Sequence, residues 1–334
     1  MTTEPRAVAG SEAPDAHPRA DETYLWSRAG TPDPAVQRLE AALEPVRFSP
    51  GGLRNAPLRM AWPFRVAAAA AVLTLVAAAA LIVQRPRPSW EVVALDGAPT
   101  VASAAIKDIG RLARNDWLET DGSSRASLAV ANIGSVTVEP GSRVRLVESA
   151  EKHHRLQLAR GTIEAFITAP PRLFFIDTPS AQAIDMGCIY TLSVKDDDSS
   201  ELSTRFGLVE LVRTVDGREV VSKVPTDATC RTDMKRGPGT PRFDDAPEEL
   251  VKALDAFDAG DAPGSVQDIA SNARPRDTLS LWHLLSRTQG ADRATVLERL
   301  VALAGRPGDT TDAATLATAP EALEAWWEHL RLTW

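Results

Sequence analysis

Cysteine and histidine are the residues whose spacing most readily indicates chemistry, and this chain has two cysteines and five histidines. Cys188 and Cys230 are too few to build a four-cysteine zinc site or an iron–sulfur cluster within one chain. In an oxidising compartment they could form one disulfide, which would close a loop of about forty residues and contribute roughly 2 to 4 kcal/mol. The alternative is a pair of buried thiols that are not joined.

The histidines do not have the spacing of a metal site. His153 and His154 are neighbours, and successive side chains on a strand point to opposite faces, so the two cannot readily share a metal ion. We expect them at the surface near a turn. His283 follows Trp282 on an apolar helical face, which favours a structural histidine in a core or an interface over a ligand.

Catalytic motifs are also missing from the sequence. It contains no nucleophile elbow, zinc-protease pair, P-loop or dinucleotide-binding glycine pattern. The formal charge of -8 opposes a general role in binding nucleic acid. We therefore predict a protein that is not an enzyme, with no cofactor and no metal, and that does not bind nucleic acid directly.

One apolar segment predicts a membrane anchor. Residues Val66 to Val83 read VAAAAAVLTLVAAAALIV, without a charge, and as a helix they would extend about 27 Å, close to the thickness of a bilayer core. Trp62 and Phe64 lie where interfacial aromatic residues are expected. We predict a transmembrane helix over 62–84. The alternative is a helix buried in a soluble domain.

The flanks of this segment predict its orientation. Some sixty polar, proline-rich residues precede it, which indicates an uncleaved signal anchor. Four arginines come before it and two directly after it, namely Arg47, Arg54, Arg59, Arg65, Arg85 and Arg87. The positive-inside rule then predicts a single-pass protein of the bacterial inner membrane, with a cytoplasmic N-terminus and periplasmic or extracytoplasmic C-terminal domains. Because an oxidising compartment stabilises disulfides, we predict the Cys188–Cys230 bridge.

The N-terminal tail, residues 1–60, is expected to be disordered except for one short amphipathic helix at 33–47. An isolated helix of this length is marginal in water, so its apolar stripe requires a partner or a membrane surface. We predict a docking peptide for a protein partner, with a loosely ordered juxtamembrane tail as the alternative. Its candidate contact residues are Tyr24, Leu25, Trp26, Val36, Leu39 and Leu43.

Residues 89–243 have the short alternating runs of a β domain, spaced about ten residues apart, which predicts a β-sandwich or a rolled sheet. Gly161 and Gly207 are expected where a strand turns or is closely approached. The basic stretch Lys235 to Arg242 is expected to be a solvated linker. Residues 244–334 are then expected to form an α-helical C-terminal domain, with apolar faces such as Leu250, Leu254 and Phe257, or Leu323, Trp326, Trp327 and Leu330.

Four stretches of the β region read IGRLARNDWLETDGSSRASLAVANIGSVTVEPGSRVRLVE, LARGTIEAFI, FFIDTPSAQAIDMGCIYTLSV and TRFGLVELV. Together they resemble the FecR domain of ferric-citrate-type regulators. The resemblance covers about residues 90 to 225. It implies sensing of a signal outside the membrane and control of an extracytoplasmic-function sigma factor through the N-terminal tail. The tail is shorter than the usual cytoplasmic helical domain of the family.

Two functional hypotheses follow from these features. In the first, the chain is a FecR-like regulator with a sigma factor as its cytoplasmic partner and an envelope or outer-membrane protein as its outer partner. In the second, it is a structural or scaffolding protein of the cell envelope that does not signal.

Overall fold

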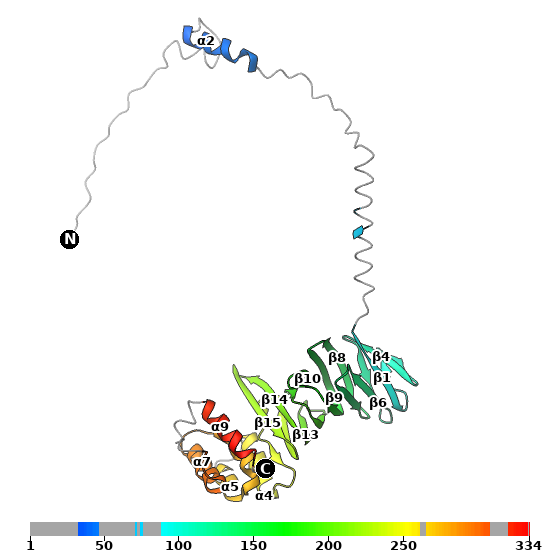
Figure 1. Ribbon diagram of the computed structural model, residues 1–334, viewed down its shortest axis with the longest axis vertical. Coiled ribbons are helices and arrows are strands. Elements are labelled where there is room, and N and C mark those ends of the chain that lie inside the picture. Colours follow the sequence, from blue (N-terminus) through cyan, green and yellow to red (C-terminus); the bar gives the residue numbers. More distant parts are fainter. Residues whose placement is uncertain are drawn as a thin grey trace, which may run out of the picture. The chain divides into compact units, whose positions relative to one another are not determined.

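The computed structural model describes residues 33–46, 71, 74–75, 88–260, 265–307, 320–332 and 334. The chain divides into two units, Met1–Gln84 and Arg85–Trp334 (Figure 1). The second unit contains the described strands and the helices that follow them.

The first unit has one described helix longer than a turn, α2 (Pro34–Leu43), followed by the short 3-10 helix η1 (Glu44–Val46). Asp33 caps α2 by accepting a hydrogen bond from the Ala35 amide at 2.6 Å. Within the described residues, no helix has the length and apolar character needed to cross a bilayer. The predicted span 62–84 lies outside the described residues except for Ala71, Thr74 and Leu75.

The second unit contains two β-sheets that share one long strand. Every described pairing in sheet A is antiparallel. Across sheet A the order is β4 (Ile109–Ala113), β1 (Ser89–Asp96), β6 (Arg125–Val130), β7 (Gly134–Val138), β9 (His153–Ile167), β12 (Ile189–Val194), β13 (Ser200–Phe206) and β16 (Ala228–Asp233), with β17 (Gly237–Pro238) and β18 (Arg242–Phe243) both pairing with β16.

Sheet B continues from the other half of β9 and has one parallel pair, between β9 and β10. Across sheet B the order is β3 (Ala104–Ala105), β2 (Thr100–Val101), β5 (Trp117–Glu119), β8 (Arg143–Ala150), β9, β10 (Phe174–Asp177), β11 (Gln182–Asp185), β14 (Leu208–Val215) and β15 (Arg218–Pro225). The β15 strand is therefore an edge of this sheet.

Gly161 is the point at which β9 passes from sheet B to sheet A. Residues up to Arg160 pair with β8, and residues from Gly161 onward pair with β12. The φ angle of Gly161 is +86°, and a Cβ atom there would overlap the Cα and Oγ of Ser142. Only glycine meets both conditions without strain, which confirms the turn predicted at this position.

The buried side chains of both sheets form a single apolar core. Along β9, burial alternates so that Leu156 and Leu158 face inward before Gly161, and Ile163 and Ala165 face inward after it. This alternation is what a strand with one solvated face requires. The core includes Leu118, Leu128, Val136, Leu146, Tyr190, Leu192, Leu202 and Leu211.

A layer of helices follows the strands and has a second apolar core, formed by residues such as Leu250, Leu254, Ile269, Leu284, Leu300 and Trp326. The helices are α4 (Glu248–Ala259), α5 (Ser265–Asn272), the 3-10 helix η2 (Pro275–Asp277), α6 (Thr278–Arg287), α7 (Gly290–Ala304) and α9 (Pro320–Leu330). Leu279 of α6 and Trp327 of α9 are buried in the core of the sheets instead. The predicted combination of a mainly β region and C-terminal helices is confirmed.

Two predictions about the β region are wrong. The stretch from Lys235 to Arg242 is not a solvated linker, because it contains β17 and the start of β18, and Gly237, Pro238 and Arg242 are buried. His154 is not at the surface, since it is 4% exposed and its ring lies 5.9 Å from that of Trp90.

The close approach at Gly161 predicts a large loss of stability when a methyl group is added. We expect Gly161→Ala to lower the free energy of unfolding by at least about 3 kcal/mol, because backbone strain and overlap with Ser142 add together. Urea unfolding of the purified chain measures the change.

Gly141 provides the matched control for this substitution. Its φ angle is +73° but a Cβ atom there would meet nothing within 4 Å. Gly141→Ala should therefore cost only the backbone strain, about 1 kcal/mol. Equal losses for the two variants would show that the contact with Ser142 does not constrain β9.

Candidate functional site

The structure does not join the two cysteines. Both are free and buried. Cys188 directly precedes Ile189, which pairs with Phe206 of β13. Cys230 pairs with Leu202, four residues before Phe206, and lies on the other side of β13. At about 3.3 Å per residue and 4.8 Å per strand, they are separated by on the order of 15 Å, and a disulfide needs Cα atoms within about 7 Å. The structure therefore does not show the predicted disulfide.

Each thiol instead has its own backbone partner. The Cys188 thiol donates to the Leu208 carbonyl at 2.7 Å, and the Cys230 thiol donates to the Gly239 carbonyl at 3.2 Å. Burial raises the pKa of both thiols to about 12, and the nearby Asp185 carboxyl adds to this effect at Cys188. Both side chains are thus inert parts of the core and not nucleophiles.

This environment predicts how the cysteines respond to alkylation. In the folded chain at about pH 8 neither thiol should react with iodoacetamide, because burial prevents both access and ionisation. After denaturation without reductant, both should be labelled, and mass spectrometry counts the labels. A chain exported in its native host that needs reductant before either cysteine reacts would contradict the free-thiol arrangement.

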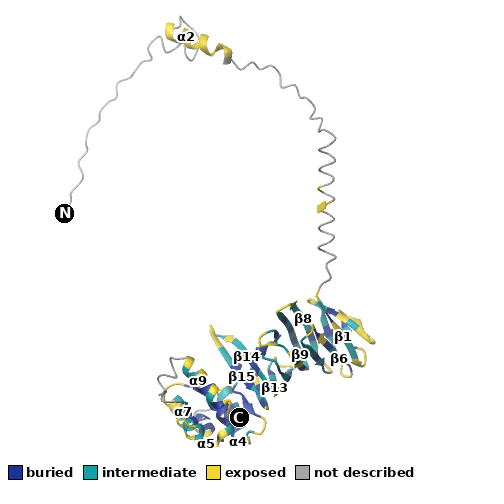
Figure 2. Cartoon of the chain, viewed as in Figure 1, coloured by how far each residue is buried: buried dark blue, intermediate teal, exposed yellow. Residues whose placement is uncertain are grey.

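The predicted docking residues lie in the first unit. Val36, Leu39 and Leu43 share one face of α2, with Leu39 64% and Leu43 55% exposed. Figure 2 shows α2 without a buried residue. Tyr24, Leu25 and Trp26 lie outside the described residues. Within the first unit, the described residues leave this apolar stripe exposed.

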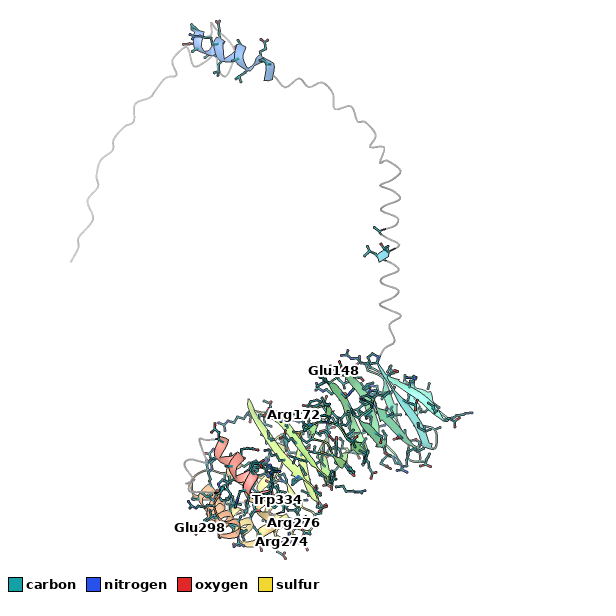
Figure 3. All side chains as sticks on the ribbon, in the orientation of Figure 1. Glu148, Arg172, Arg274, Arg276, Glu298 and Trp334 are labelled. Atoms are coloured by element: carbon teal, nitrogen blue, oxygen red, sulfur yellow. The ribbon has the colours of Figure 1, made fainter. Side chains whose placement is uncertain are left out.

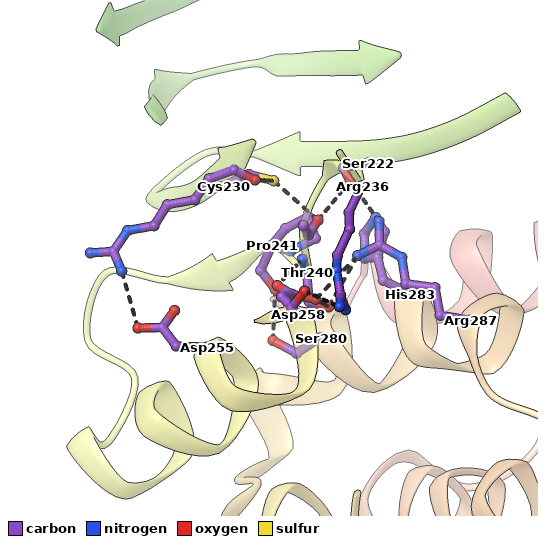
Figure 4. Close-up of polar contacts among 12 residues, drawn as sticks. Ser222, Cys230, Arg236, Thr240, Pro241, Asp255, Asp258, Ser280, His283 and Arg287 are labelled. Atoms are coloured by element: carbon purple, nitrogen blue, oxygen red, sulfur yellow. Dashed lines mark hydrogen bonds and ion pairs between the residues drawn. The ribbon is translucent and has the colours of Figure 1, made fainter. Parts of the chain in front are cut away.

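A group of polar contacts in the second unit lies where α6 meets the edge of sheet B (Figure 4). The Lys223 amide of β15 donates to Nε2 of His283 at 2.9 Å, and Nη2 of Arg287 donates to the Val221 carbonyl at 3.4 Å. His283 and Arg287 are four residues apart, so they lie on the same side of the helix. Together they satisfy backbone groups that an edge strand leaves unpaired.

Arg287 also connects α6 to α4 and to the segment that was expected to be a linker. Its guanidinium donates to the hydroxyls of Ser222 at 2.7 Å and Thr240 at 3.0 Å, and lies 3.9 Å from the Asp258 carboxylate. Asp258 in turn accepts from the Thr240 amide and hydroxyl at 2.6 and 2.8 Å. Burial lowers the pKa of Arg287 from its ordinary value, but this degree of hydrogen bonding compensates the buried charge.

His283 is a neutral hydrogen-bonding residue at the contact between α6 and β15. Nδ1 lies 2.9 Å from the Leu279 carbonyl and donates to it, so Nε2 is the acceptor for the Lys223 amide. Burial, followed by the charge of Arg287, lowers the pKa of His283 well below its ordinary value. The expectation of a structural histidine in a core or interface is confirmed.

The Lys223 side chain adds a contact that was not predicted from the sequence. Its ammonium lies 4.7 Å from the ring centroid of Trp327 and 5.4 Å from that of Trp282, and it donates to the Glu324 carboxylate at 2.9 Å. Cation–π attraction and an ion pair thus hold one lysine of β15 against both α6 and α9. The described residues contain no group of three or more histidine, cysteine or acidic residues that could hold a metal ion.

Residues 116–210 match the family model described as FecR protein, from β5 to the first residues of β14. This segment is therefore similar to FecR proteins, and the resemblance predicted from the sequence is confirmed for it.

Two crystal structures of a proposed anti-sigma factor from Parabacteroides distasonis are similar to the chain, each at 17% identity and a TM-score of 0.33. Both similarities cover 41% of this chain, and they cover 63% and 62% of the other chains. The chain thus spans less than two thirds of these structures. No curated protein matches it.

The contact of His283 with β15 predicts an acid-sensitive contribution to the stability of the fold. Since His283 stays neutral in the fold, the unfolded state binds more protons once the pH falls below about 6.5, so stability decreases below that pH. His283→Leu removes this effect and leaves the Lys223 amide without its acceptor. We expect the variant to be about 1 to 3 kcal/mol less stable than the wild type at about pH 8.

Below pH 6.5 the difference between the two proteins should shrink by up to about 1.4 kcal/mol per pH unit. Chemical unfolding across the pH range measures it. His153→Leu is the control, because the side chain of His153 is 39% exposed. A constant difference between the wild type and His283→Leu at all pH values would show that His283 is not the group responsible.

Proposed function

We propose that this protein is a membrane-anchored regulator of transcription. The match of residues 116–210 to the FecR family carries the proposal. In this proposal, the β region and its helices lie outside the cytoplasm and respond to an envelope or outer-membrane protein. The N-terminal tail lies in the cytoplasm and controls an extracytoplasmic-function sigma factor.

The sequence between these parts supports an anchor in the bacterial inner membrane. The uncharged residues Val66–Val83 are long enough to span a bilayer, and the excess of arginine before them favours a cytoplasmic N-terminus. A single helix then connects the signal-receiving part with the tail.

The apolar face of α2 supports the cytoplasmic half of the proposal. Leu39 and Leu43 are exposed one helical turn apart, and amphipathic helices of this kind bind by placing such residues in a groove of the partner. A helix of ten residues gains its stability from such a partner.

Charged substitutions on this face test the proposal. We expect the double variant Leu39→Asp and Leu43→Asp, expressed in the native host, to lose its sigma factor and to change transcription of that factor's target genes several-fold. Removing two anchor residues of a short interface costs about 2 kcal/mol or more each. Crosslinking followed by mass spectrometry identifies the partner, and RNA sequencing measures the response.

Ala41→Asp is the matched control, since Ala41 is exposed on the opposite side of α2. It introduces a carboxylate into the same helix but should leave the captured partner and the transcripts unchanged. If deletion of residues 1–46 also changes no transcript, the regulatory proposal fails, and a scaffolding role in the envelope explains the chain better.

A further inference from the structure

A groove of about 570 Å³ opens between the end of sheet B and helix α9. Its walls come from the start of β14 at Leu208, the end of β15 at Pro225, β18 at Phe243, and α9 at Trp327. Trp334 and Arg276, which are labelled in Figure 3, also line it. The volume is in the range of pockets that hold small molecules, about 300 to 1,000 Å³.

The apolar part of this groove is a fixed aromatic cluster. The ring centroid of Trp334 lies 5.0 Å from that of Trp327 and 6.1 Å from that of Phe243, with edge-to-face geometry. Nε1 of Trp334 donates to the Thr278 hydroxyl at 3.0 Å, which fixes the orientation of the ring. Trp334 is only half-buried, so part of its surface remains open to the groove.

The charged groups of the groove are already neutralised by one another. Three pairs lie within its lining, namely Lys223 with Glu324, Arg276 with Asp227, and Arg331 with Glu328. The remaining carboxylate, Glu210, pairs with Arg172 at 2.6 Å. Among the described side chains, the charged residues that line the groove therefore form its rim as paired hydrogen-bond donors and acceptors.

These features determine which ligand chemistry fits. Because each of these charged side chains already has an oppositely charged partner, an added anion or cation gains little net attraction there. A sugar hydroxyl both donates and accepts, so neighbouring hydroxyls can bond to a carboxylate and a guanidinium that remain paired. The apolar face of a sugar ring can stack on an indole such as that of Trp334.

We propose that this groove binds a neutral saccharide of one or two rings, stacked on Trp334 and hydrogen-bonded to the ion pairs of the rim. The Glu328 carboxylate accepts from one sugar hydroxyl, and the Arg331 guanidinium donates to the next. This binding site is independent of the proposed control of a sigma factor, because it involves only residues of the second unit.

Calorimetric titration of the purified full chain tests the site. The neutral probes are N,N′-diacetylchitobiose, cellobiose and maltose, and the charged probes are digalacturonate and trilysine. At least one neutral disaccharide should bind with a dissociation constant below about 1 mM, a usual range for a small polar ligand. The charged probes should bind more weakly or not at all.

Two exposed rim residues and one control on the same helix show where the ligand binds. Glu328→Gln and Arg331→Gln should each weaken binding by about tenfold, the effect of losing one charge-assisted hydrogen bond. Glu321→Gln should leave binding unchanged, because Glu321 is exposed on α9 but does not line the groove.

Three outcomes would overturn the proposal. The first is the absence of binding by every neutral disaccharide at about 10 mM. The second is tighter binding of digalacturonate or trilysine. The third is equal affinity of the wild type and both rim variants, with thermal melting showing that all three are folded.

Discussion

The contact between α6 and the free edge of β15 determines how the second unit is assembled. An edge strand exposes amide and carbonyl groups that can pair with other chains. Here His283 accepts from one amide and Arg287 donates to one carbonyl. The same helix places Leu279 in the core of the sheets and Leu284 in the core of the helices. The polar and apolar contacts of one ten-residue helix therefore fix both layers.

The polar groups between α6 and β15 are hydrogen-bonded to one another, which explains how the charge of Arg287 can be buried there. Arg287 contacts two hydroxyls, a carbonyl and the Asp258 carboxylate. A buried ion pair adds little net stability, but removing one partner leaves a charge that nothing compensates. Such groups favour a single packing arrangement. The helices are thus held in one position on the sheet.

The local features of this fold could be predicted from the sequence, whereas the long-range contacts could not. Alternating side chains indicated the strands, and the glycine at position 161 indicated the turn in β9. The disulfide was predicted because a pair of cysteines carries no information on the register that places Cys188 and Cys230 on different sides of β13. The stretch around Gly237 has the glycine and proline content of a linker, yet tertiary pairing with β16 makes it a strand.

The contact between α6 and β15 was also not predicted, because it too joins residues that are distant in the sequence. Lys223 and His283 are sixty positions apart in the chain, and an alternating strand around Lys223 gives no indication of a helix at its edge. The one available signal was the spacing of His283 and Arg287, four residues apart on a helix with several apolar residues. Two polar groups at that spacing on a buried face need partners, and an edge strand supplies them.

The sharing of β9 by both sheets limits how the length of this domain can change during evolution. An insertion or deletion in a strand moves every following side chain to the opposite face. In β9 that shift would expose the inward residues of two sheets at once, Leu156 and Leu158 in one and Ile163 in the other. The Asp216–Gly217 turn between β14 and β15 has no such restriction, since both residues are exposed. Length variation among relatives should therefore concentrate at that hairpin, while β9 keeps a constant number of residues.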